Sequence, residues 1–183
     1  GPEAELQLLI IGGSQGARLF GEVLPPAICA LPEALRTRLK VVQQVRQEQL
    51  EAVTAVYEAA GVKTQLSPFF SHMPDLLAKS HMVISRSGAS SVTELAVVGR
   101  PSLLIPLAIA MDDHQTGNAE TLRDAGAADV IQERELTVER VTKILSERLS
   151  DGEALQARAE AAKSVGKFNA SSELADLAEC VVQ

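Results

Sequence analysis

A chain of 183 residues is long enough to bury a hydrophobic core and lies in the usual size range of one domain. Hydrophobic residues make up 46% of it, but only 3% are aromatic and there is no Trp. The core must therefore be built from Ala, Leu, Val and Ile, which suits helices packed on a parallel sheet. The net charge of −7, without any cluster of basic residues, argues against nucleic acid as a partner and gives no electrostatic reason to bind an anionic membrane.

The cysteines and the apolar segments indicate a soluble protein of a reducing compartment, so we expect a cytoplasmic chain. Cys29 and Cys180 are far apart and form neither a CxxC motif nor a cluster with metal-ligand spacing. The longest apolar run, residues 101–111, is interrupted by Pro106 and is too short to span a bilayer, and no signal segment opens the chain. Gly1 and Pro2 resemble the scar left by protease removal of a tag, so the expected domain comprises residues 3–183.

Apolar strand patterns and helical patterns alternate along the chain. This alternation predicts an α/β fold, a Rossmann-like open parallel sheet of about six strands with helices on both faces. The expected strands are residues 6–11, 39–45, 62–67, 81–85, 102–105 and 128–132. The expected helices are residues 19–31, 47–60, 73–79, 89–98, 114–125, 137–149, 152–165 and 171–182.

Three local features qualify these helices. Pro25 and Pro26 should lie near the beginning of the first helix or kink it, because proline lacks the backbone N–H that a helix interior needs. Thr137 has the position and side chain of an N-cap. Residues 166–169 read as a turn, so we expect the final helix to swing free of the sheet and to be poorly anchored.

Two turns between a strand and a helix carry the residues of an anion site. Backbone N–H groups at a helix N-terminus favour phosphate, and glycine lets the backbone approach it closely. Their spacing matches neither GxGxxG nor GxxxxGK[ST], so it does not support a dinucleotide fold or a P-loop ATPase. The candidate phosphate-binding residues are Ser14, Gln15 and Gly16 after the first strand, and Gly88, Ala89, Ser90 and Ser91 after the fourth.

The second turn has an equally simple structural interpretation. Ser87, Ser90 and Ser91 are typical helix-capping residues, and Ser91 followed by Glu94 has the form of a capping box. Glu94 is alternatively a ribose ligand, because one carboxylate can accept hydrogen bonds from two neighbouring hydroxyl groups. The two roles compete for the same oxygen atoms.

Three segments together resemble one known family. GGSQGAR at residues 12–18, SRSGASSVTELAVVGRP at 85–101 and DDHQTGNA at 112–119 are similar to the C-terminal domain of the MurG family. The resemblance covers nearly the whole chain in the same order. It implies a GT-B fold and the donor-binding half of an inverting transferase, which moves N-acetylglucosamine from UDP-N-acetylglucosamine to lipid I and forms lipid II of peptidoglycan.

The same resemblance implies partners, a location and the roles of several residues. The partners are UDP-N-acetylglucosamine, an N-terminal acceptor domain and, through that domain, lipid I; no cofactor or metal is implied. The full-length enzyme would work at the cytoplasmic face of the inner membrane, and this domain by itself would be inactive because the catalytic base belongs to the acceptor domain. Glu94 would bind the ribose, Gln115 and Asn118 the N-acetylglucosamine, and the loop of Phe70 the uracil.

Some of these positions have alternatives. The best-known family members carry glutamine where this chain has His114, so its assignment to the sugar is weaker than that of Gln115. Adjacent rings such as Phe69 and Phe70 more often plug the edge of a core than hold a ligand. Asp112 and Asp113 resemble a metal-binding pair only superficially, because no third ligand has a useful spacing, and helix capping is favoured.

Other function classes fit parts of the sequence. The donor domain of another GT-B enzyme, such as a diacylglycerol glycosyltransferase, or of an epimerase would keep the phosphate turns and change the loop around Gln115. A regulatory UDP-sugar binder would lack catalysis altogether. A Rossmann-type oxidoreductase is disfavoured by the absence of GxGxxG.

Overall fold

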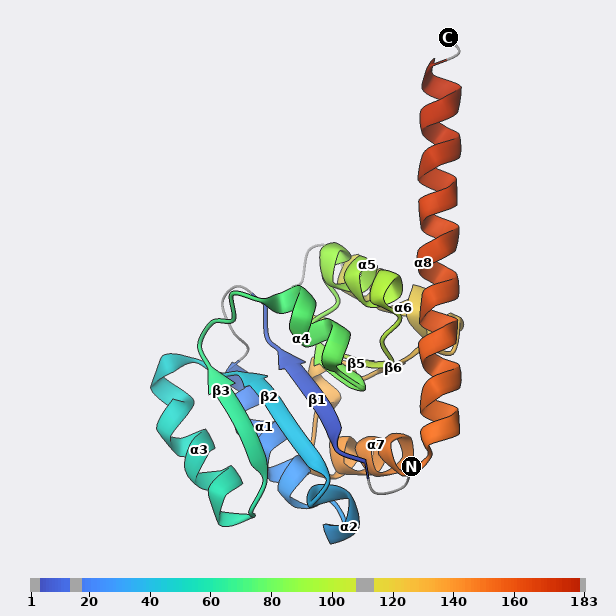
Figure 1. Cartoon of the computed structure of the whole chain (residues 1–183). Helices are drawn as coiled ribbons and strands as arrows, with labels where there is room; N and C mark the ends of the chain where they lie inside the picture. The colour runs from blue at the N-terminus through green and yellow to red at the C-terminus, as the bar shows by residue number, and fades with distance from the viewer. Residues whose placement is uncertain (1–3, 14–17, 108–113, 182–183) are drawn as a thin grey trace.

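A six-stranded parallel sheet forms the centre of the protein (Figure 1). The computed structural model describes residues 4–13, 18–107 and 114–181, with side chains through residue 166. The strands are ordered β3-β2-β1-β4-β5-β6, and every neighbouring pair is parallel. They are β1 Leu6–Ile11, β2 Leu39–Gln44, β3 Lys63–Ser67, β4 Met82–Ser85, β5 Ser102–Leu104 and β6 Ala128–Val130. The predicted parallel sheet of about six strands is confirmed.

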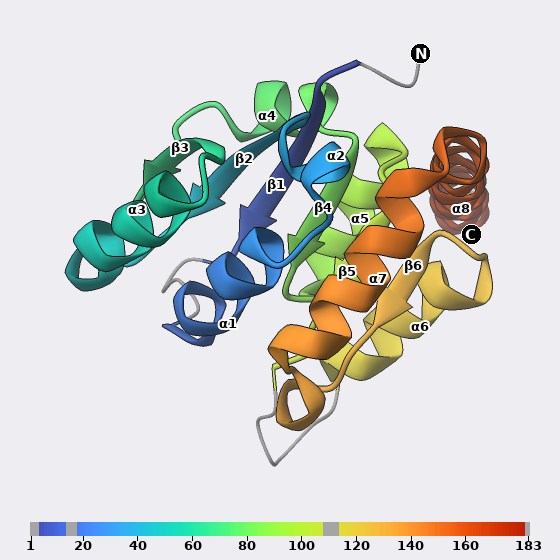
Figure 2. The same ribbon diagram turned by 90° about the horizontal axis from the view of Figure 1, so that it is seen from below.

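The helices cover both faces of the sheet, as predicted (Figure 2). One hydrophobic cluster packs α1, α2, α3, α7 and the start of α8 against the sheet, and the other packs α4, α5, α6 and a later part of α8. The helices are α1 Arg18–Cys29, α2 Glu33–Arg36, α3 Leu50–Ala59, α4 Met73–Lys79, α5 Ala89–Val98, α6 His114–Asp124, α7 Val138–Ser150 and α8 Gly152–Val181. Short 3-10 turns, η1 Gln47–Gln49 and η2 Glu133–Glu135, precede α3 and α7. The core is aliphatic because these layers meet through Leu, Val, Ile and Ala.

Strand order creates a switch point between β1 and β4. From β1 the chain moves outward through β2 and β3, then returns to the other side of β1 and continues through β4, β5 and β6. Ile11 at the end of β1 lies beside Ser85 at the end of β4. In open α/β sheets, ligands bind where the strand order reverses in this way, outside the carboxyl ends of the strands.

Of the two alternatives predicted for the prolines of α1, a place near the beginning of the helix is wrong. Pro25 and Pro26 are in the second half of the helix, not near its beginning. Pro25 is buried in the core, and the helix continues beyond it, with the N–H of Ala30 donating to the carbonyl of Pro26 at 3.0 Å. Packing of the apolar face outweighs the lost backbone hydrogen bonds here, because most helix stability in proteins comes from tertiary contacts. The N-cap prediction for α7 is confirmed, since the Thr137 hydroxyl accepts from the N–H of Arg140 at 3.2 Å.

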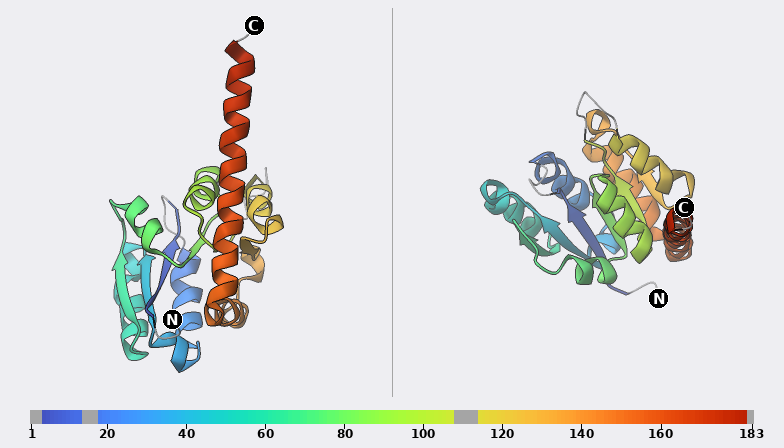
Figure 3. Two further views of the ribbon diagram at one scale, coloured as in Figure 1. Left: turned by 45° about the vertical axis from the view of Figure 1, so that its right-hand side comes forward. Right: turned by 90° about the horizontal axis from the view of Figure 1, so that it is seen from above.

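The predicted turn at residues 166–169 is wrong, because α8 is one continuous helix. Gly166 allows α8 to approach α5 closely: a Cβ atom placed there would lie 2.7 Å from the carbonyl oxygen of Ala96. Glycine therefore acts here as a helix-packing residue and not as a helix breaker. Beyond this contact the ribbon of α8 projects away from the sheet and the other helices (Figure 3). That residues 171–182 are weakly anchored stays a prediction.

Ion pairs tie the two last helices to the edge strand. Asp129 of β6 accepts two hydrogen bonds from Arg148 of α7, both at 2.9 Å, and one from Arg158 of α8 at 2.7 Å. One carboxylate thus joins three elements at the edge of the sheet. None of the described helices is both long and apolar enough to span a membrane.

The close contact at Gly166 predicts an effect on stability. Replacing a helical glycine with alanine normally stabilises by up to about 1 kcal/mol. In Gly166→Ala the new methyl group meets rigid backbone, so we expect the free energy of unfolding to fall by about 1–3 kcal/mol. Gly117→Ala in α6 is the matched control, because a Cβ there meets no atom within 4 Å. Urea denaturation measures both, and an equal or higher stability of Gly166→Ala would contradict the packing argument.

His81 predicts a pH dependence. Its Nδ1 atom accepts a hydrogen bond from the N–H of Gln7 at 2.9 Å, which requires that this nitrogen be unprotonated. Desolvation, with a smaller contribution from the charge of Arg100, lowers the pKa of His81 below its usual 6.5. The neutral form is therefore favoured in the folded protein, and the stability it contributes is present above pH 6.5 and lost as the pH falls through the lowered pKa.

We expect the stability of the wild type to decline more than that of His81→Gln as the pH falls from 7.5 to 5. Denaturation at several pH values gives this difference, and NMR titration of the ring gives the pKa itself. A pKa of His81 at or above about 6.5 would refute the assignment.

Candidate nucleotide-sugar site

The candidate site lies at the switch point of the sheet. Gly12 and Gly13 leave β1 at this edge, and Gly13 has a φ of 88°, a left-handed conformation that favours glycine. The N–H of Gly12 donates to Oε1 of Gln44 at 3.3 Å, which ties the turn to β2. Ser14, Gln15 and Gly16, predicted to bind phosphate, lie outside the described residues.

The start of α5 differs from the capping interpretation. The N-cap is Gly88, and no described side chain accepts a hydrogen bond from the first turn of the helix. Ser91 and Glu94 both lie inside α5, so they form no capping box, and the hydroxyl of Ser87 is used elsewhere. The first N–H groups of a helix have no partner within the helix. Those of Ala89, Ser90 and Ser91 are thus the donors that this turn can offer to an anion.

Glu94 is exposed on α5, beyond the first turn. Within the described part of the chain it forms no hydrogen bond and no ion pair. Its carboxylate is therefore not committed to the fold. This is the arrangement expected of a ribose ligand, and it removes the competition with capping.

Gln115 and Asn118 extend from the first turns of α6 to the turn after β4. The side-chain oxygen of Gln115 accepts from the N–H of Ser87 at 3.3 Å and from the N–H of Leu107 at 3.0 Å. Asn118 donates from Nδ2 to the carbonyl of Ser87 at 3.1 Å. The hydroxyl of Ser87 donates to the main-chain carbonyl of Gln115 at 2.7 Å. The structure thus brings the two amide side chains together with the candidate phosphate turn, as their common assignment to one ligand requires.

The two aromatic rings of the loop after β3 lie in different surroundings. Phe70 is half-buried and packs against the cluster on the α4–α5 face, as the core-edge alternative proposed. Its side chain thus contributes to packing at the edge of the core. The core-edge position that the sequence favoured for both rings is wrong for Phe69, which is 73% exposed and lines a hollow of about 350 Å³ with Phe70 and His72. His114 is exposed at the first position of α6.

Arg86 holds the candidate phosphate turn from the opposite face of the sheet. Its guanidinium forms an ion pair with Glu133 of η2, donates to the carbonyl of Ile105 at 3.3 Å and lies 4.9 Å from the centre of the Phe20 ring. Sequence reasoning missed this role, because nothing local indicates that Glu133 will lie beside Arg86. The pair is largely shielded from water, so each charge depends on the other.

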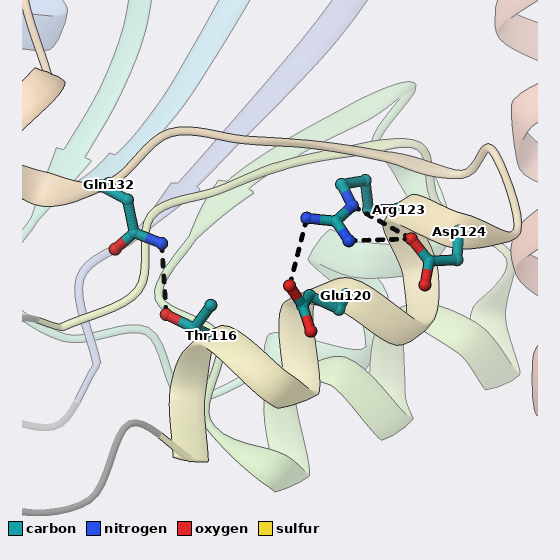
Figure 4. Close-up of polar contacts among 5 residues, drawn as sticks. All are labelled: Thr116, Glu120, Arg123, Asp124 and Gln132. Atoms are coloured by element: carbon teal, nitrogen blue, oxygen red, sulfur yellow. Dashed lines mark hydrogen bonds and ion pairs between the residues drawn. The ribbon is translucent and has the colours of Figure 1, made fainter.

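Further contacts fix α6 itself (Figure 4). Gln132, which follows β6, donates from Nε2 to the hydroxyl of Thr116 at 3.2 Å. Arg123 pairs with Glu120 and Asp124 near the other end of the helix. Among the described residues, no group of three or more His, Cys, Asp or Glu side chains could hold a metal ion, and Asp112 and Asp113 lie outside that set.

A family model for the glycosyltransferase family 28 C-terminal domain matches residues 7–179. The chain belongs to this family. It is 53% identical over 178 residues to a UDP-N-acetylglucosamine–N-acetylmuramyl-(pentapeptide) pyrophosphoryl-undecaprenol N-acetylglucosamine transferase of Caulobacter vibrioides, covering 97% of this chain and 49% of the relative. A transferase of the same name from Brucella suis biovar 1 is 43% identical and covers all of this chain and 48% of the relative. The chain spans about half the length of these curated relatives.

Solved structures agree with this assignment. The crystal structure of Acinetobacter baumannii MurG superposes with a TM-score of 0.83 at 36% identity, covering 94% of this chain and 51% of the other. The fold is therefore the Rossmann-like α/β fold of GT-B enzymes. A UDP-N-acetylglucosamine 2-epimerase structure from Listeria monocytogenes, at 19% identity and a TM-score of 0.64 over 96% of this chain, shares the fold alone.

The shielded ion pair predicts a stability effect that distinguishes it from a surface pair. Glu133→Gln leaves Arg86 without its counter-charge, and we expect it to lower the free energy of unfolding by about 2 kcal/mol. Glu135→Gln is the control in the same 3-10 turn, because its pair with Arg140 is exposed and should contribute less than about 0.5 kcal/mol. Thermal or urea denaturation compares the two variants, and equal losses would show that the Arg86–Glu133 pair contributes no more than the exposed pair.

Proposed function

We propose that this chain is the donor-binding half of an inverting glycosyltransferase that moves N-acetylglucosamine from UDP-N-acetylglucosamine to lipid I and forms lipid II. The observation that carries the proposal is the uncommitted carboxylate of Glu94 beside an uncapped start of α5. A diphosphate needs donors and a ribose needs a carboxylate, and α5 offers both on one helix. The relatives' shared name supplies the reaction and the acceptor.

Each part of the donor has a group suited to it. The N–H groups of residues 89–91 would hold the diphosphate, joined by those of Ser14, Gln15 and Gly16 from the turn after β1. Glu94 would accept from both ribose hydroxyls, and the main chain at Phe70 would meet the uracil. Gln115, Asn118 and, more weakly, His114 would face the N-acetylglucosamine.

The reaction needs a second half that binds the acceptor. A base there would remove the proton from the acceptor's sugar hydroxyl, which then attacks the anomeric carbon as UDP leaves. Helix N–H groups at the diphosphate would stabilise the negative charge that develops on the departing UDP. We therefore propose an N-terminal acceptor domain as partner, and binding without turnover for this domain by itself. Because the relatives' acceptor carries undecaprenol, we place the whole enzyme at the cytoplasmic face of the inner membrane.

Titration of the wild-type domain tests the donor, and one variant tests the ribose ligand. We expect binding of UDP-N-acetylglucosamine in preference to UDP-galactose, and no binding of NADH.

Glu94→Ala should weaken UDP binding by about 1.5–3 kcal/mol, the usual loss for a hydrogen bond to a charged group, without changing the melting temperature. Wild-type protein should also prefer UDP to dUDP, and Glu94→Ala should remove this preference.

Thr93→Ala is the matched control, since Thr93 is an exposed neighbour on the same helix. Equal affinity of the wild type for UDP-N-acetylglucosamine and UDP-galactose would favour the donor domain of a different enzyme. Unchanged UDP affinity in Glu94→Ala would exclude Glu94 as the ribose ligand. Transfer to lipid I by the isolated domain would refute the two-domain division of labour.

A further inference from the structure

One side-chain oxygen joins the two loops that border the candidate site. Oε1 of Gln115 accepts from the N–H of Ser87, in the turn between β4 and α5, and from the N–H of Leu107, after β5. These main-chain groups belong to different crossovers of the sheet and, because both are donors, only a shared acceptor can join them. Gln115 therefore helps to set the spacing between the two loops, beyond the bond from the N–H of Ile105 to the carbonyl of Ser85 and together with the bond from Arg86 to the carbonyl of Ile105.

The same contacts fix the orientation of the Gln115 amide. Turned by 180°, the side chain would present its NH2 group to two N–H donors, leaving both without an acceptor. The oxygen must therefore face the protein, and both of its acceptor positions are used there. Only Nε2 is left to face a ligand, so Gln115 can donate to a sugar oxygen but cannot accept from a sugar hydroxyl.

Each polar group of Ser87 forms a hydrogen bond. Its N–H donates to Gln115, its carbonyl accepts from Asn118, and its hydroxyl donates to the main-chain carbonyl of Gln115. The residue is fully buried, so each lost bond would leave a polar group without water to replace it. All three partners belong to the first turns of α6. Ser87 is followed directly by Gly88, the N-cap of α5, so α6 fixes the point from which α5 begins.

From this we infer that Gln115 is a positioning residue for the diphosphate turn in addition to any contact with the sugar. The inference rests on the proposed function, because it takes the start of α5 as the diphosphate site. Removing the side chain releases the N–H groups of Ser87 and Leu107 and lets the turn move away from the position in which its helix N–H groups converge. Affinity for UDP itself then falls, although UDP carries no sugar for Gln115 to contact.

Comparing uridine, UDP and UDP-N-acetylglucosamine distinguishes a positioning role of Gln115 from a direct contact with the sugar. We expect Gln115→Ala to weaken UDP about fivefold or more, the equivalent of at least one hydrogen bond, and to weaken uridine less than about twofold. NMR titration measures both, including weak binding. Gln132→Ala is the matched control. Gln132 is also half-buried and bonded to α6, through Thr116, but it has no hydrogen bond to the described residues of either loop, so the UDP affinity of Gln132→Ala should be unchanged. A loss confined to UDP-N-acetylglucosamine in Gln115→Ala would overturn the inference and leave a simple sugar contact.

Amide hydrogen exchange in the absence of ligand supplies an independent readout. Exchange at Ser87 and Leu107 should accelerate in Gln115→Ala, stay slow in Gln132→Ala, and return toward the wild-type rate in Gln115→Glu, whose carboxylate can accept from both N–H groups. Unchanged exchange in Gln115→Ala would overturn the inference. Failure of the wild type to bind UDP would refute the proposed function instead, and the exchange rates would still decide whether Gln115 holds the two loops.

Discussion

The pairing of β1 with β4 determines where every part of the candidate site lies. Because these strands are parallel and Ile11 lies beside Ser85, the turns that follow them emerge at the same edge of the sheet. Residues more than 70 positions apart in the chain thus come to border one space. The pairing depends in turn on burial of both faces of the sheet, which two hydrophobic clusters cover. Only the edge at which the strands end is then left for a ligand.

Around that edge, polar side chains mainly form contacts that fix the position of the main chain. Arg86 is bound by Glu133 on the α1–α7 side, and Ser87 is bound by the start of α6 on the other. These contacts hold the start of α5 in place although no described side chain caps it. Rigid support of this kind lowers the cost of ordering a binding site when the ligand arrives. The carboxylate of Glu94, proposed to contact the ribose, by contrast forms no hydrogen bond or ion pair within the described residues.

Local pattern was sufficient to predict the sheet and most of the helices. β1 and α5 were predicted with the bounds that the structure has, because a continuous apolar run and a helical spacing bounded by glycines are unambiguous. The grouping of Gln115 and Asn118 with the turn after β4 came from resemblance, since no periodicity relates residues so far apart. The partner of Arg86 and the inward-facing oxygen of Gln115 could not be predicted, because both depend on loops from different crossovers.

The sequence by itself determined the alternation of strands and helices, the aliphatic core and the family, since these depend on residue types and on spacing along the chain. Tertiary structure decided what individual residues do. Gly166 has the same intrinsic conformational freedom in a turn or in a helix, and only the approach of Ala96 on α5 selects the helix. Likewise Ser87 could cap a helix or bond across the sheet edge, and the nearness of α6 decides between them. Such choices differ by about 1 kcal/mol locally, so contacts between distant segments outweigh local preference.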